Sequence, residues 1–283
     1  MSLESKVVGP TGPHTHTVIF LHGRDSGCAE FADEFFESET SPGEGPDQTP
    51  DTLSELFPTV KWVFPSAPVL RSARFDGAEM SQWFDMWSVE DPEERPETQR
   101  DGLQRSVGQI LSLIRQEGDD GQFAAGVPRS RIFLCGISQG FATAVAALLA
   151  EGQGGFAGMI GLCSWMPSAT RAEVSFGEDD NNTTPSLSQL RTVFTMTPSS
   201  NTANEQMGGA VKVDSLRQIP ILITHSLDDN VVPVGNGRRL RDILRLHGFT
   251  VEWKEYPDGG HWINEPQGVD DMVHFLRKYM DLC

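Results

Sequence analysis

A serine stands at the centre of residues 136–140 (GISQG), which have the pattern G-x-S-x-G. The apolar run 131–135 precedes this motif and the small-residue run 142–147 follows it, so the serine falls at a predicted strand–turn–helix junction. A turn this tight has little room for side chains beside the serine, and the amides that open the next helix favour developing negative charge. The pattern predicts that Ser138 is a nucleophile; a helix N-cap is the alternative.

A serine hydroxyl needs a general base, and that base needs a carboxylate to orient it. In this class of motif the acid and then the histidine follow the serine along the chain. We expect His261 to be the base, because its glycine-rich loop, 258–263, lies between a predicted strand and the last predicted helix. Three other histidines follow the serine. His247 and His274 lie on predicted helices or at their ends, and His225 precedes the expected acid, so none of them fits the role.

The acid is expected after the predicted strand 220–225, where Asp228 and Asp229 are neighbours. Adjacent side chains point in different directions, so only one of the two can reach His261. We expect Asp229 to be that acid because it stands directly before the turn N-V-V-P, and Asp228 to shape the loop or face solvent.

An oxyanion hole is expected from backbone amides. The segment 22–27 (HGRDSG) follows the first predicted strand, and its turn can aim the N–H of Arg24 at the nucleophile. The second donor would be the N–H of Gln139, the residue after the serine. His22 is expected to be a hydrogen-bonded turn residue without a catalytic role.

Several further motifs accompany these residues in a fixed order: FLHGRDSG (20–27), FPSAP (64–68), QWFDMWS (82–88), GISQGFATAV (136–145), SWMP (164–167), HSLDDNVVP (225–233) and GGHW (259–262). Together they resemble the acyl-protein thioesterase/carboxylesterase (phospholipase-carboxylesterase) branch of the α/β-hydrolases. The resemblance implies hydrolysis of esters or thioesters with no metal or other cofactor. It also implies that Trp83, Phe84 and Trp165 lie near an acyl-binding cleft; packing in the core is the alternative for each.

The chain departs from that family's usual pattern at three places. Phe141 replaces a second glycine after the elbow, and we expect it to line or narrow the substrate space beside the nucleophile. The turn G-R-D-S places a charged side chain near the mouth of the site, and the link 168–219 is long. The triad is untouched by these changes. The substrate stays open between an acyl-protein and a small molecule, including a specialised metabolite that a tailoring esterase would process.

The elements that must position these residues form an alternating pattern. Helical periodicity occurs over 103–114, 240–244 and 269–276, and continuous apolar runs predict buried strands at 17–22, 60–64, 131–135, 158–163, 220–225 and 250–256. Strands that alternate with helices indicate a mostly parallel sheet with helices on both faces. We therefore expect one α/β-hydrolase domain over residues 1–283, with flexible insertions near 38–56 and 168–215. The second insertion is expected to be a surface loop, or else a lid over the site.

Composition limits the partners. Acidic residues number 40 and basic residues 22, for a net charge of −18, which argues against binding to nucleic acid or anionic membranes. No apolar run reaches membrane-spanning length, so no stable membrane insertion is expected. The four cysteines are widely spaced and the N-terminal segment 1–13 lacks a secretory signal, which indicates a reducing, cytoplasmic setting. Oligomeric state cannot be inferred from these features.

Two other classes of function remain as alternatives. A metal-dependent hydrolase could use His14, His16 and His22, but no acidic ligand accompanies them by pattern. A catalytically silent binding protein could keep the same fold, but an intact set of serine, aspartate and histidine argues against it.

Overall fold

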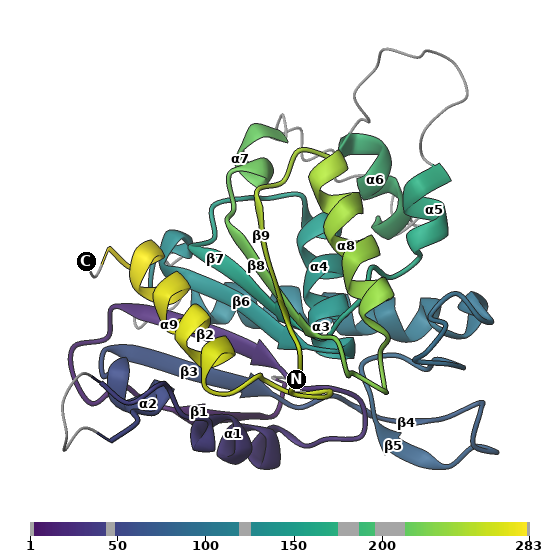
Figure 1. Ribbon diagram of the computed structural model, residues 1–283. Helices are drawn as coiled ribbons and strands as arrows, with labels where there is room; N and C mark the ends of the chain where they lie inside the picture. The colour runs from purple at the N-terminus through teal and green to yellow at the C-terminus, as the bar shows by residue number, and fades with distance from the viewer. Residues whose placement is uncertain (1–2, 44–48, 119–125, 175–186, 196–212, 282–283) are drawn as a thin grey trace.

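The computed structural model describes residues 3–43, 49–118, 126–174, 187–195 and 213–281 (Figure 1). Its centre is a seven-stranded sheet with the order β1-β3-β2-β6-β7-β8-β9, in which β1 runs antiparallel to β3 and the other neighbours are parallel. A separate antiparallel hairpin pairs β4 with β5. The strands are β1 (Ser5–Val8), β2 (His16–Leu21), β3 (Val60–Pro65), β4 (Val69–Arg71), β5 (Glu79–Ser81), β6 (Ile132–Ile137), β7 (Gly158–Leu162), β8 (Ile221–Ser226) and β9 (Val251–Tyr256).

Helices cover both faces of this sheet, as Figure 1 shows. α1, α2 and α9 pack on one face, and α3, α4 and α8 on the other. The helices are α1 (Cys28–Glu37), α2 (Leu53–Leu56), α3 (Arg100–Glu117), α4 (Gln139–Glu151), α5 (Ala169–Val174), α6 (Leu187–Phe194), α7 (Val213–Arg217), α8 (Val234–Leu246) and α9 (Gln267–Tyr279), with short 3₁₀ turns at Pro96–Thr98 and Arg129–Arg131. The α/β-hydrolase architecture expected from the sequence is confirmed.

The central strands explain why the apolar runs were informative. Every residue of β2, β6, β7 and β8 is buried. Along β2, Ile19 and Leu21 enter the cluster under α3 and α4, whereas Val18 and Phe20 enter the cluster under α1 and α9. Successive strand residues point to opposite faces, so a strand covered on both sides must be apolar throughout.

Part of the 168–215 insertion differs from the expected surface loop. α6 lies in it and buries Leu187, Leu190 and Phe194 in the same cluster as α3 and α4. Residues spaced by three and four positions share one helix face, so even this short helix has an apolar side to pack. Residues 175–186 and 196–212 lie outside the described residues, as do residues 44–48 of the insertion at 38–56.

Among the described residues, no helix combines the length and the apolar character that a membrane span requires. Cys28, Cys135 and Cys163 are free thiols. Burial raises the pKa of the Cys135 thiol, which fits a core residue rather than a reactive one.

Candidate active site

Ser138 joins β6 to α4 in a strained backbone conformation, with φ 54° and ψ −127°. The glycines on either side are required by close backbone approach. A Cβ on Gly136 would lie 2.5 Å from the backbone nitrogen of Phe141, and one on Gly140 would overlap the carbonyl oxygen of Leu21. The turn therefore presents the serine at the carboxyl end of β6, where the parallel strands of the sheet end.

This crowding predicts a strong effect of Gly140→Ala. The added methyl group would collide with backbone of β2, so we expect a loss of about 3 kcal/mol or more in the free energy of unfolding. Gly108→Ala is the matched control, because a methyl group added at this exposed position of α3 would have no atom within 4 Å. That change should stabilise the helix by about 0.5–1 kcal/mol. Chemical denaturation of both variants checks the contrast, and equal midpoints would contradict it.

The carboxylate of Asp229 meets the imidazole of His261 at the end of β8. His261 Nδ1 donates to Asp229 Oδ2 at 2.8 Å, and the backbone amides of Val231 and Val232 donate to Oδ1 at 2.9 and 2.8 Å. The Asp229 side chain is fully buried. Burial raises the pKa of this carboxyl, but hydrogen bonds from His225 and His261 outweigh that effect and hold the pKa well below its ordinary value. Asp229 is thus an ionised acceptor, and it leaves Nε2 of His261 free to accept a proton.

The neighbouring aspartate has a different partner. Asp228 Oδ1 accepts the backbone N–H of Gly260 at 2.9 Å. Gly259 and Gly260 have φ values of 119° and 60°, a conformation that glycine adopts without strain. Asp228 therefore ties down the loop that carries His261, while Asp229 contacts the imidazole itself.

The turn after β2 passes beside the serine. A Cβ on Gly23 would lie 3.5 Å from Cβ of Ser138. His22 anchors this turn: its Nδ1 donates to the Gly23 carbonyl at 2.7 Å, and its Nε2 accepts the N–H of Ala67 at 3.0 Å. Burial lowers the pKa of His22, in keeping with a neutral ring that has both nitrogens paired.

The side chains of Arg24 and Gln139, the two expected oxyanion donors, form hydrogen bonds with neighbouring segments. Arg24 Nε donates to Gln82 Oε1 at 2.8 Å, and Arg24 Nη2 donates to Ser72 Oγ at 3.0 Å. Gln139 Oε1 accepts the N–H of Trp83 and Gln139 Nε2 donates to the Phe84 carbonyl, both at 2.8 Å. These bonds hold the segment after β5 against the turns that carry Arg24 and Gln139.

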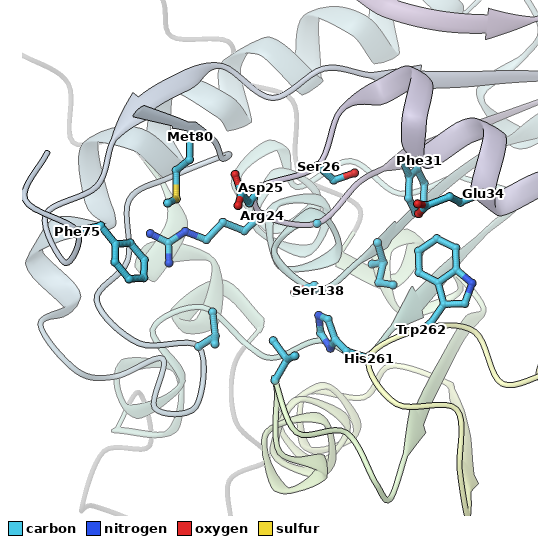
Figure 2. A pocket seen from close by; sticks show the side chains of 14 residues that line it. Arg24, Asp25, Ser26, Phe31, Glu34, Phe75, Met80, Ser138, His261 and Trp262 are labelled. Carbon is cyan, nitrogen blue, oxygen red and sulfur yellow. The ribbon is translucent and has the colours of Figure 1, made fainter. Parts of the chain in front are cut away.

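Ser138 and His261 line one cavity of about 320 Å³. Figure 2 shows the His261 ring beside Ser138, with Arg24, Phe75 and Met80 toward one end of the cavity and Phe31, Glu34 and Trp262 toward the other. The full lining consists of Gly23, Arg24, Asp25, Ser26, Phe31, Glu34, Phe75, Met80, Val89, Ile137, Ser138, Val231, His261 and Trp262.

The aromatic residues expected near the substrate do not line this cavity. Trp83, Phe84, Phe141 and Trp165 are all buried in the cluster under α3 and α4, and none of them lines this cavity. A Cβ on Gly161 would overlap the Phe141 ring, so that ring packs over β7 instead of narrowing the space beside the serine. All four aromatic side chains pack in the core.

The apolar walls come from residues that the sequence analysis did not select. Phe31 belongs to α1, Phe75 and Met80 to the β4–β5 hairpin, and Trp262 follows His261 directly. Adjacency to His261 was a signal that could have identified Trp262. No local pattern indicated that the hairpin reaches the serine.

Metal binding by the N-terminal histidines is disfavoured by geometry. His16 begins β2 and His22 follows its end, so at about 3.3 Å per residue they are roughly 20 Å apart and cannot share an ion. A buried group of Cys163, His225 and Asp229 has ligand atoms within 4.8 Å of one another. Burial, and then the charge of Asp229, raises the pKa of the Cys163 thiol.

Two family models match parts of this chain. Residues 48–187 match the family described as phospholipase/carboxylesterase. The acyl-protein thioesterase 1 of Schizosaccharomyces pombe is 33% identical over 172 residues, which make up 59% of this chain and 66% of that protein. These matches support the phospholipase/carboxylesterase family for this chain, within the α/β-hydrolase fold. A second family, prolyl oligopeptidase, matches residues 124–283, the part of the chain from β6 to α9.

The length of the match differs among the relatives. The acyl-protein thioesterase 1 of Gibberella zeae is 27% identical over 94% of this chain and 92% of that protein. The matches to the S. pombe protein and to the Cryptococcus neoformans acyl-protein thioesterase 1 reach a little under two thirds of those relatives' lengths, 66% and 61%. The crystal structure of Zea mays acyl-protein thioesterase 2 shares the fold with a TM-score of 0.66 at 22% identity, covering 98% of this chain and 99% of that chain.

Proposed function

We propose that this protein is a serine hydrolase that cleaves carboxylic ester or thioester bonds, with Ser138 as nucleophile, His261 as general base and Asp229 as the orienting acid. The observation that carries the proposal is that His261, held by a buried carboxylate, lines the same cavity as a serine on a strained elbow. The family match supports a hydrolase, and the relatives' names support esters or thioesters as substrates.

The proposed reaction has two stages, acylation of the serine and hydrolysis of the acyl-enzyme. His261 Nε2 takes the proton of Ser138 Oγ as Oγ attacks the carbonyl carbon, and the same proton then passes to the departing alcohol or thiol. Water next attacks the acyl-enzyme with His261 again as base, which releases the acid and restores the serine. In each half-reaction the oxyanion accepts hydrogen bonds from the backbone N–H groups of Arg24 and Gln139. One such donor lowers the activation free energy by about 3–4 kcal/mol in comparable sites.

The substrate is proposed to carry an apolar acyl group of modest length. Phe31, Met80 and Trp262 give the cavity apolar walls, and its volume of about 320 Å³ is near the low end of the roughly 300–1,000 Å³ typical of ligand pockets. The relatives named acyl-protein thioesterases favour an acyl-protein as its source. The modest volume favours the second candidate, an esterase acting on a small metabolite.

A series of p-nitrophenyl esters from acetate to palmitate distinguishes these substrates. We expect kcat/KM to be greatest for short and medium chains and to fall toward palmitate, because the cavity is small. A rate that rises steadily to palmitate would contradict this prediction and favour a long-chain thioesterase. A fluorophosphonate probe tests the reaction class separately: covalent labelling at Ser138 is expected, and an unlabelled protein would point to a catalytically silent member of the fold.

A further inference from the structure

A second imidazole, that of His225, contacts the Asp229 carboxylate and does not line the cavity. His225 is the penultimate residue of β8, and its side chain is fully buried. Its Nε2 lies 2.8 Å from the carbonyl oxygen of Val232 and 3.2 Å from Oδ2 of Asp229. Both neighbours are acceptors, so Nε2 carries the proton; it donates to the Val232 carbonyl and lies close enough to Oδ2 to stabilise the carboxylate.

This contact completes the hydrogen bonding of the carboxylate. Oδ1 accepts the amides of Val231 and Val232, and Oδ2 accepts Nδ1 of His261 and lies 3.2 Å from Nε2 of His225. An ionised carboxylate has about four acceptor positions, and here two nitrogen atoms lie against each oxygen. The carboxylate therefore has one well-defined rotamer, in which Oδ2 faces His261.

Burial of the His225 ring leaves one of its two nitrogen atoms without a hydrogen bond to the described part of the chain. A Cβ on Gly237 of α8 would overlap His225 Nδ1, and the ring of Trp253 on β9 lies 6.3 Å away, centroid to centroid. Nδ1 has no hydrogen-bond partner among the described residues. Leaving a buried polar atom unpaired costs about 1–3 kcal/mol, which an apolar side chain of similar size would avoid. Packing alone thus gives no reason for an imidazole at this position, whereas the two contacts made by Nε2 do.

We propose that His225 is a positioning residue that holds the Asp229 carboxylate in place for His261. The inference rests on the proposed function, since Asp229 matters only if His261 is the base. Through its bond to the Val232 carbonyl, the ring also links the carboxylate to the turn between β8 and α8. The other titratable or charged groups near this pair are Cys163 at the end of β7, Asp228 in the same turn, and Glu255 on β9, which forms an ion pair with Arg238 of α8.

The test compares His225→Leu with His225→Gln, whose amide N–H can reach the place of Nε2. Activity is measured with p-nitrophenyl butyrate and divided by the sites titrated with a fluorophosphonate, so that unfolded protein does not count. We expect His225→Leu to lower kcat about 10- to 100-fold with KM nearly unchanged, because the base is misplaced without a change in the cavity. His225→Gln should recover most of that loss.

The pH profile adds a readout that a purely structural role would not move. With one donor removed, the carboxylate attracts the proton on His261 more strongly, so the acid limb of kcat/KM should move to higher pH in His225→Leu. His247→Leu is the matched control, because His247 is also buried and donates from Nδ1 to a backbone oxygen, that of Ile243, at the far end of α8. The His247→Leu variant should have a lower free energy of unfolding and an unchanged kcat per titrated site.

The outcomes separate this inference from the proposed function. A parent protein that does not react with the fluorophosphonate at Ser138 would overturn the function itself. A reactive parent with an unchanged kcat and acid limb in His225→Leu would overturn only the role of His225. If His225→Leu does not fold, the tautomer of His225 is read from nitrogen shifts of ¹⁵N-histidine-labelled parent protein, assigned against His225→Gln. Protonation at Nε2 is expected, and protonation at Nδ1 would overturn the inference.

Discussion

Ser138→Ala should lower kcat by roughly 10⁶-fold, because without Oγ no acyl-enzyme can form and only binding and the oxyanion donors remain. The fold should be unaffected. Alanine and serine tolerate the φ of 54° equally, and Ser138 lines the cavity, so loss of its hydroxyl enlarges an existing cavity and leaves no new void in the core. We expect the free energy of unfolding to stay within about 0.5 kcal/mol of the parent value.

Ser26→Ala is the matched control for this variant. Ser26 lines the same cavity but lies on the turn after β2 rather than on the elbow. Its loss should leave kcat and fluorophosphonate labelling near the parent values. The test measures the rate of ester hydrolysis and the denaturation curve of both variants and compares them with the parent protein. A folded Ser138→Ala protein with parent rates would refute the assignment of the nucleophile.

Asp229→Asn is expected to lower kcat by about 10⁴-fold, the size of effect seen when a triad aspartate is replaced by its amide. Asparagine can still accept the amides of Val231 and Val232 through its oxygen, which turns its NH₂ group toward His261. An NH₂ group cannot accept from Nδ1, so the imidazole must move its proton to Nε2. In that tautomer it cannot accept the proton of the serine.

Asp228→Asn separates this effect from a general disturbance of the loop. Its oxygen can still accept the N–H of Gly260, so the loop that carries His261 should keep its shape and kcat should remain close to the parent value. The two variants differ by one position and make the same chemical change. If Asp228→Asn were the inactive one, the choice of acid made here would be wrong.

Local chemistry explains what could be predicted from the sequence. Gly136 and Gly140 must be glycine because backbone approaches their Cβ positions within 3 Å, and that requirement is visible as G-x-S-x-G. The central strands are recognisable because strands covered on both faces must be apolar throughout. β1 and the β4–β5 hairpin escaped prediction because they are short and partly exposed, and so lack such runs.

The sequence by itself determined the strand–turn–helix context of Ser138, the loop of His261 and the α/β architecture, since each depends on neighbours along the chain. Only the tertiary structure decided which aromatic rings border the cavity, and that His225 contacts the Asp229 carboxylate. Those contacts join residues from α1, the β4–β5 hairpin, β8 and the β9–α9 loop. Whether a side chain faces a cavity or the core depends on which residues pack against it. The spacing of residues along the chain does not specify those packing partners.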